Sequence, residues 1–372
     1  MQGKTMKVYN KIELIIIDTL GYDCLTENGG KIPWFNGLSY KRAFSTSGWT
    51  LPSVASILTG KFCHEHRSYN HVMPISKDCL MIQEIFKKNG YLTAGIFNNY
   101  NFDPEIGFDR GFDQYIYIKG FDHHNPFHVY FELINELNKC QKYFLVFHTN
   151  MVHNYFMNDP IYDSNEIPID IIKYLLGDKR MLQTLPEQFH YVVRKRYEKA
   201  VYETAMRLQK CLRHINLNET LCYIVSDHGE GLQLPRIHHG GRLHNDLVHV
   251  PLTLLNEVGE NNHLFSLIQL KDEILYKAGL RKEPSKYREI FMEDRGYFYI
   301  NGESISDNYR LDYSTVHDIK LQAHINWPLK YISASVPSQG YYWKEIYNIQ
   351  DDPDEKNNLC INLPFEDAFV NL

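Results

Sequence analysis

The hexapeptide ELIIID, residues 13–18, decides the fold of this chain. Its aliphatic residues are not interrupted by polar ones, which is typical of a parallel strand buried on both faces of a sheet. Ligands bind at the carboxyl ends of the strands in open α/β sheets. Asp18, at that end, is therefore a candidate metal ligand or base, and the alternative is an aspartate that only starts a turn.

Two later segments repeat this pattern, YFLVFH at 143–148 and LCYIVSD at 221–227. Each is an apolar run that ends in a residue able to bind a metal: His148 in the first, Asp227 followed by His228 in the second. Such residues at three strand ends favour one shared site over chance placement. The expected fold is α/β, a mixed, mostly parallel sheet sandwiched by helices.

Helical spacing of apolar residues separates these strands. Helices are expected at 80–88, 127–140 and 187–215, and a further strand at 91–97. The segment 155–187 is rich in Asn, Asp and Pro, which indicates an irregular excursion near the strand ends, where substrate loops tend to lie.

From about residue 290 the sequence changes to short runs of aromatic and β-branched residues. Asn301-Gly302 separates two such runs and is a hairpin signal. We therefore expect two units: a catalytic α/β domain over 1–288 and a small antiparallel β subdomain over 289–372, packed on the first.

Composition excludes some functions. The 372 residues include 39 basic and 45 acidic ones, a net charge of −6, whereas proteins that bind nucleic-acid backbones normally carry a basic excess. No run approaches the ~20 apolar residues of a membrane span. The short polar start leads directly into a strand, so a cytoplasmic location is expected. The seven cysteines form no CxxC pair, and reduced thiols are expected.

The stretch FSTSGWTLPSVASILTG, residues 44–60, indicates a loop that enters a short helix of small residues. Thr50 is placed where an N-cap residue would lie, and Pro52 is tolerated in the first turn. A hydroxyl there faces the free amides and the positive dipole end of the helix, which favours a bound phosphate, a sulfate or a developing alkoxide. The alternative is that Thr50 only caps the helix.

Together these residues suggest a metal-assisted mechanism. Asp18, Asp227 and His228 would supply three ligands for a divalent metal, and the Thr50 hydroxyl a fourth. A cation lowers the pKa of a hydroxyl that it binds and so makes it a better nucleophile at neutral pH. Mn²⁺, Zn²⁺, Ca²⁺ or Mg²⁺ would suit this set, as one ion or two. His148 is left open between a ligand and a supporting, hydrogen-bonded role.

The sequence resembles the sulfatase branch of the alkaline phosphatase superfamily, through eight segments in family order that span nearly the whole chain. These are LIIIDTLGYD (14–23), WTLPSVASILTG (49–60), NGYLTAG (89–95), GFDRGFD (107–113), FHTNMVHNYF (147–156), SDHGE (226–230), HHGGRLHNDLVHVPL (238–252) and EIYNIQDDPDEKNNL (345–359).

This resemblance implies a role for each matching residue. It implies that His153 contacts the substrate or leaving group, and that His239 binds the transferred group or a second metal. Thr19 stands where many sulfatases carry a further metal-binding aspartate. The resemblance also implies metal ligands at Asp18, Asp227 and His228 and a nucleophile at Thr50.

Departures from the sulfatase pattern concern the substrate. Sulfatases convert a Cys or Ser to formylglycine within a Cys/Ser-x-Pro-Ser-Arg motif, but here the motif begins with Thr50 and has Val54 in place of the arginine. Threonine cannot give that aldehyde. Residues 97–99, Phe-Asn-Asn, also replace a Gly-Lys-Trp-His run that grips sulfate in many sulfatases. An unmodified threonine is what the family's phosphodiesterases and phosphotransferases use.

The sequence therefore predicts a metal-dependent hydrolase or transferase that acts on phosphoesters, with a small-molecule, glycan-linked or lipid-linked substrate and no nucleic-acid partner. One alternative is a sulfuric ester hydrolase that works without formylglycine. The other is a non-catalytic binding or scaffold protein of a surface-polysaccharide pathway. The oligomeric state is left open.

Overall fold

The computed structural model describes residues 7–27, 35–70, 73–119, 125–155, 187–233, 236–284, 290–295, 299–300, 303–304, 320–337 and 340–362. Of the expected excursion at 155–187, residues 156–186 lie outside these ranges.

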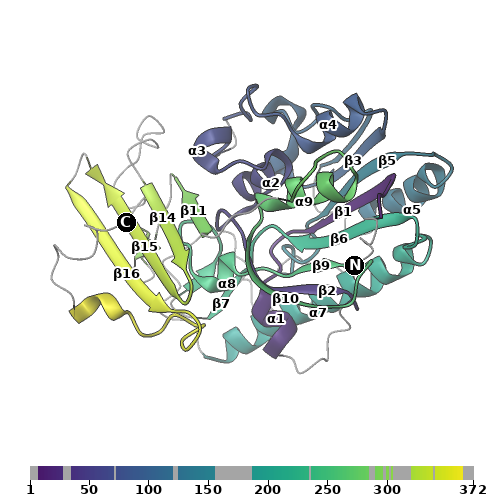
Figure 1. Ribbon diagram of the computed structural model, residues 1–372. Coiled ribbons are helices and arrows are strands. Elements are labelled where there is room, and N and C mark those ends of the chain that lie inside the picture. The colour runs from purple at the N-terminus through teal and green to yellow at the C-terminus, as the bar shows by residue number, and fades with distance from the viewer. Residues whose placement is uncertain are drawn as a thin grey trace, which may run out of the picture.

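An eight-stranded sheet forms the centre of the molecule, in the order β10-β2-β9-β6-β1-β5-β3-β4 (Figure 1). β9 runs antiparallel to β6 and β2, and the other neighbouring pairs are parallel, which confirms the mixed, mostly parallel sheet. The strands are β1 (Lys11–Ile17), β2 (Leu38–Phe44), β3 (Leu92–Asn98), β4 (Gln114–Ile118), β5 (Tyr143–Thr149), β6 (Thr220–Ser226), β9 (Leu252–Leu254) and β10 (Gly259–Ser266).

Helices cover both faces of this sheet (Figure 1). Successive side chains of a strand point to opposite faces, so Leu14 and Ile16 of β1 belong to one buried cluster and Ile15 and Ile17 to the other. The first cluster includes residues of α2 (Thr50–Thr59), α4 (Ile82–Lys88) and α9 (Gln269–Lys277). The second includes residues of α5 (Asn125–Leu137) and α7 (Glu187–Leu212).

The carboxyl-terminal part forms a four-stranded antiparallel sheet in the order β11-β14-β15-β16. Its inner side packs on Phe44, Leu247 and Val248 of the larger unit. The strands are β11 (Ile290–Asp294), β14 (Lys320–Asn326), β15 (Leu329–Val336) and β16 (Tyr341–Asn348). The boundary expected between residues 288 and 289 falls within 285–289, outside the described ranges, and stays a prediction.

Smaller elements connect these units. The short helices are α1 (Tyr22–Glu27), α3 (Cys63–His66), α8 (Asn245–Val248) and the 3₁₀ turns η1 (Tyr100–Phe102), η2 (Pro104–Ile106) and η6 (Leu359–Asn362). Two hairpins pair β7 (Gly231–Gln233) with β8 (Arg236–His238) and β12 (Tyr299–Ile300) with β13 (Glu303–Ser304). All seven cysteines carry free thiols. Within the described ranges, every helix is too short or too polar to cross a lipid bilayer.

Candidate active site

The carboxyl ends of three central strands bring the predicted site together. β1 lies between β5 and β6, with Ile16 opposite His148 and Ile17 opposite Ser226. Asp18 directly follows β1, and Asp227 directly follows β6. Both residues therefore lie at the same edge of the sheet. Asp18, His148 and Asp227 are fully buried. Strand register thus joins side chains that are about two hundred positions apart.

Thr19 turns the chain sharply after Asp18, with a φ of 67°, in the left-handed region. Such a conformation is costly for a β-branched residue and persists only where the surroundings hold it. The Thr19 amide donates to Asp227 Oδ1 (3.1 Å) and its hydroxyl donates to Asp18 Oδ1 (2.7 Å). The Tyr197 hydroxyl, from α7, donates to the Thr19 carbonyl (2.7 Å) and accepts from the Gly21 amide (2.9 Å).

Thr50 places its hydroxyl against the strand ends. Its Oγ1 lies 3.2 Å from Asp18 Oδ1 and 3.1 Å from His228 Nε2, and the residue is 2% exposed. The prediction that Thr50 is the N-cap was wrong, because α2 begins at Thr50 and Trp49 is the extended cap residue. The Thr50 hydroxyl is thus turned toward Asp18 and His228 instead of capping the first turn.

His228 is oriented by its own neighbouring backbone. Its Nδ1 donates to the Gly229 carbonyl (2.8 Å), so Nε2 faces Asp18 Oδ1 (3.3 Å) and Asp227 Oδ2 (3.7 Å). Gly229 is required here, since a Cβ would lie 2.1 Å from the Asp246 carbonyl oxygen. Burial lowers the pKa of His228, but the charges of the two carboxylates outweigh burial and raise it to about 9.

The two carboxylates have opposite pKa shifts. Burial raises the pKa of Asp227 to about 7, and the negative charge of Asp18 adds to this effect. Burial also acts on Asp18, but its hydrogen bond with His228 and the charges of nearby histidines hold its pKa well below the ordinary value. Two buried carboxylates beside one imidazole supply the oxygen and nitrogen donors that a divalent cation prefers.

A divalent metal fits this donor set. Among the described residues, Asp227 Oδ2 and both ring nitrogens of His148 are buried without a hydrogen-bond partner. One ligand atom each of Asp18, His148 and Asp227 lie within 4.8 Å of one another, so a point in their midst is at most ~2.8 Å from all three, and a small inward movement of the side chains would give metal–ligand bonds of ~2.0–2.2 Å. Burial lowers the pKa of His148 to about 4, so its imidazole is neutral at neutral pH.

His153 and His239 lie at the edge of this centre. The ring of His239 is 4.7 Å from that of His228 and 5.0 Å from that of His153. Both residues are partly exposed, in contrast to Asp18 and His228. The carboxylate of Glu230, which is 2% exposed, lies 3.0 Å from His239 Nδ1.

Three supporting residues were missed or left undecided from sequence. Asn99, directly after β3, donates from Nδ2 to Asp18 Oδ2 (2.8 Å). The sequence signal for Asn99 was a polar residue at a fourth strand end. Glu230 has only a weak sequence signal, an acidic residue two positions after His228, and the Tyr197 contact has no local sequence signal.

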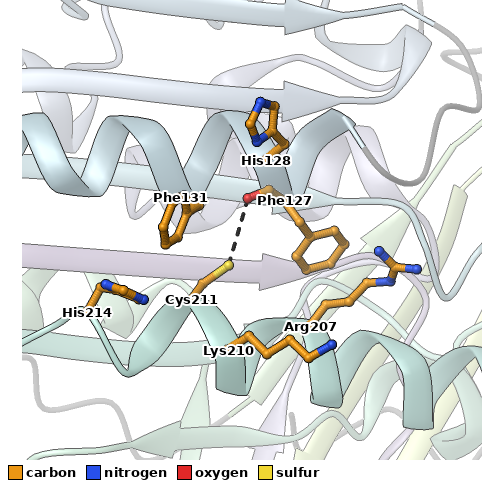
Figure 2. Close-up of a pocket in the computed structure, with 7 residues that line it drawn as sticks. All are labelled: Phe127, His128, Phe131, Arg207, Lys210, Cys211 and His214. Carbon is orange, nitrogen blue, oxygen red and sulfur yellow. Dashed lines mark hydrogen bonds between the residues drawn. The ribbon is translucent and has the colours of Figure 1, made fainter.

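A separate pocket of about 420 Å³ lies between α5 and α7, away from these residues (Figure 2). Figure 2 shows the side chains of Phe127, Phe131 and Cys211 in the middle of this group, with the basic side chains and the two histidines around them. The lining residues are Phe127, His128, Phe131, Arg207, Lys210, Cys211 and His214.

The fold and the strand-end site define a protein of the alkaline phosphatase superfamily, as the sequence predicted. Within that superfamily the chain belongs to the sulfatase family, whose family model matches residues 12–257. Members of this family are metal-dependent hydrolases, which is consistent with the cluster of Asp18, His148 and Asp227. No curated protein matches the sequence at a significant level.

Solved structures share the fold at low sequence identity. The phosphonate monoester hydrolase of Agrobacterium radiobacter is 15% identical, with a TM-score of 0.72 over 95% of this chain and 92% of that one. The phosphonate monoester hydrolase of Silicibacter pomeroyi is 17% identical, with a TM-score of 0.70 over 95% and 91%. The 2-O GAG sulfatase BT1596 is 15% identical, with a TM-score of 0.70 over 95% and 88%.

Proposed function

We propose that the protein is a metal-dependent hydrolase or transferase that acts on phosphoesters, with Thr50 as an unmodified nucleophile. The observation that carries this proposal is the contact of the Thr50 hydroxyl with both Asp18 and His228. Membership of the sulfatase family and the hydrolases of the same fold support ester cleavage in general.

The residues that would hold the metal are Asp18, Asp227, His228 and the Thr50 hydroxyl. The donor set of carboxylate and hydroxyl oxygens with an imidazole nitrogen suits Mn²⁺ or Zn²⁺, and also accepts Mg²⁺ or Ca²⁺. When bound, the cation would lower the pKa of the Thr50 hydroxyl and balance negative charge that develops on the transferred group.

In the first chemical step, Oγ1 of Thr50 attacks phosphorus in line as an alkoxide, its proton having passed to water. The bond between Oγ1 and phosphorus forms while the bond from phosphorus to the leaving oxygen breaks. His153 gives a proton to the leaving oxygen. His239, whose Nδ1 donates to Glu230, lies beside the transferred group, and a proton taken up on its Nε2 would let it donate to an equatorial oxygen and stabilise that charge.

In the second step, water or an acceptor hydroxyl attacks phosphorus and passes its proton to His153, which restores that histidine for the next cycle. The bond between phosphorus and Oγ1 breaks, and the departing Thr50 alkoxide takes a proton from water to regain its hydroxyl. Water as the nucleophile makes the protein a hydrolase, and an acceptor alcohol makes it a transferase. A small-molecule, glycan-linked or lipid-linked phosphoester is the substrate class that we propose.

Two features favour phosphoesters over sulfate esters. Position 50 is a threonine, which cannot become formylglycine. Val54 stands where sulfatases have an arginine in the same motif, and here it is fully buried within the core on the α2 side of the sheet. The α2 region thus lacks both groups with which sulfatases prepare their nucleophile.

The proposal is tested with purified protein, loaded in parallel with Mn²⁺ or Zn²⁺, on bis-p-nitrophenyl phosphate, p-nitrophenyl phosphate and p-nitrophenyl sulfate. We expect turnover of at least one phosphoester, a loss of about 10³-fold or more in Thr50→Ala, and partial retention in Thr50→Ser. Acid quenching during turnover should leave one phosphoryl group on the peptide that contains Thr50.

A matched control is Thr59→Ala, at the other end of α2, where the buried hydroxyl donates to the Ala55 carbonyl (2.6 Å) of its own helix. Its turnover should equal that of the wild type. Turnover of the sulfate ester alone would favour a sulfatase without formylglycine. Absence of turnover with every metal would favour a binding or scaffold protein.

A further inference from the structure

His148 is a buried imidazole that lies beside Asp18 at the proposed metal site. It is fully buried, and neither ring nitrogen has a hydrogen-bond partner within the described part of the chain. The backbone of Asn98 lies near enough to raise the pKa of His148, but the two groups do not have the geometry of a hydrogen bond. Buried polar groups are nearly always paired, and an unpaired one costs about 1–3 kcal/mol. A bound group that pairs this imidazole would remove that cost.

Aromatic rings fix the direction of this imidazole. Phe102 packs edge-on to the His148 ring at 4.5 Å, and Phe97 lies parallel to it at 6.2 Å. Held this way, Nε2 of His148 faces Asp18 Oδ2 at 3.8 Å, which is too far for a hydrogen bond. Two atoms that bind the same ion at about 2.0–2.1 Å lie at most ~4.2 Å apart, so both of these atoms can reach one ion.

His148 and His228 approach Asp18 at different oxygens. His228 Nε2 lies 3.3 Å from Oδ1, whereas His148 Nε2 lies 3.8 Å from Oδ2. The unpaired Oδ2 of Asp227 is a further donor in the same place, and it lies 3.7 Å from His228 Nε2. The two imidazoles therefore border the two carboxylates from two sides.

We propose that Nε2 of His148 is a direct ligand of the metal, so that the site has two imidazole nitrogens. This inference rests on the metal site of the proposed function and adds a ligand to it. Imidazole is a borderline donor that suits Zn²⁺ and other transition metals, whereas Ca²⁺ and Mg²⁺ prefer an all-oxygen set. The site accordingly selects Zn²⁺ over Ca²⁺ and Mg²⁺.

Zinc K-edge X-ray absorption of the zinc-loaded full chain counts its imidazole ligands directly. We expect two in the wild type, one in His148→Asn and two in His153→Asn, which removes a partly exposed histidine beside the site. Equilibrium dialysis should show that His148→Asn binds Zn²⁺ at least ~100-fold more weakly, beyond the ~10–100-fold loss typical of an outer hydrogen-bond partner. Equal imidazole counts in wild type and His148→Asn would overturn the proposal.

A crystal structure of zinc-loaded wild type decides the matter if His148→Asn does not fold. We expect a distance of about 2.0–2.1 Å from His148 Nε2 to the ion, and a distance beyond ~3 Å would refute the assignment. The outcome is independent of the phosphoester proposal. Two imidazole ligands without phosphoester turnover would confirm His148 as a ligand and contradict the proposed enzymatic function. Turnover with only one imidazole ligand would support the function and contradict the ligand assignment.

Discussion

The Thr50 hydroxyl lies 3.2 Å from Oδ1 of Asp18, across 32 positions of sequence. The distance is set by two rigid elements, since Asp18 follows the central strand β1 and Thr50 begins α2, all ten residues of which are buried. Functional groups carried by packed helices and strands are positioned more precisely than groups on loops. Substitutions of the groups that position Asp18 and its neighbours are therefore the sharpest tests of the site.

The metal should account for the stability of the site. Without metal, in chelator at pH 8, we expect Asp227→Asn to melt no lower than wild type. The amide removes one of two buried charges and keeps an oxygen for the amides of Thr19 and His228. Saturating Mn²⁺ or Zn²⁺ should raise the melting temperature of wild type by far more than that of the variant, since ligand at 100 times Kd stabilises by about 2.7 kcal/mol.

Thermal-shift curves with and without metal measure this effect. The exposed Asp78→Asn should follow the wild type in both conditions. An equal metal-induced shift in Asp227→Asn would show that Asp227 does not bind the ion.

Tyr197→Phe should loosen the strained turn at Thr19. The change leaves the Thr19 carbonyl and the Gly21 amide without their partner, which costs about 1–3 kcal/mol for buried groups. We expect a lower urea midpoint and weaker metal binding, because the turn sets the position of Asp18. The control is Tyr202→Phe on the same helix, where the side chain is 42% exposed. An unchanged midpoint in Tyr197→Phe would contradict this account.

Glu13 should make stability depend on pH. Burial raises its pKa from 4.5 to about 7, against the opposing hydrogen bonds of Tyr130 and Tyr143. A raised pKa means that the folded state holds the proton more tightly, so the contribution is complete below pH 4.5 and is lost as the pH rises toward 7. Each pKa unit corresponds to ~1.4 kcal/mol, so the loss is about 3 kcal/mol.

Urea titrations of wild type and Glu13→Gln between pH 5 and pH 8 test this prediction. We expect the variant to gain stability relative to the wild type as the pH rises, because glutamine stays neutral. Parallel pH curves for the two proteins would mean that Glu13 ionises normally in the folded state.

A buried ion pair inside the carboxyl-terminal part should hold that part against α8, because both of its members contact Asn245. Lys330 Nζ lies 2.7 Å from Glu355 Oε1 with both side chains fully buried, and it also donates to Asn245 Oδ1 of α8 (3.0 Å). Lys330→Met should lower the free energy of unfolding by about 3–5 kcal/mol, since it leaves Glu355 buried without its cation. Adding Glu355→Gln should recover part of this loss.

The comparison for this pair is Lys356→Met, which removes the exposed pair with Asp354 and should change stability by less than ~1 kcal/mol. Chemical denaturation gives the free energy of unfolding of the wild type and of these three variants. If Lys330→Met and Lys356→Met lower the free energy of unfolding equally, the buried pair does not stabilise this part of the chain.

Local patterns were sufficient to predict the sheet and the set of strand ends. Continuous apolar runs predicted β1, β5 and β6, because a strand buried on both faces has no polar alternation. Polar residues directly after these runs identified Asp18 and Asp227, since parallel strands present their carboxyl ends at one edge. The predicted helix ends were less accurate. α7 ends at Leu212, three residues before the predicted end at 215, because the chain forms a turn there.

Contacts across the sheet were decided only by the tertiary structure. The sequence could not show that Asn99 donates to Asp18, that Tyr197 holds Thr19, or that the nitrogens of His148 lack partners, because each depends on packing between distant segments. Periodicity reports which face of its own element a residue occupies. Distances of 3 to 4 Å between side chains depend on strand register and on how helices pack on the sheet, and those are properties of the whole chain.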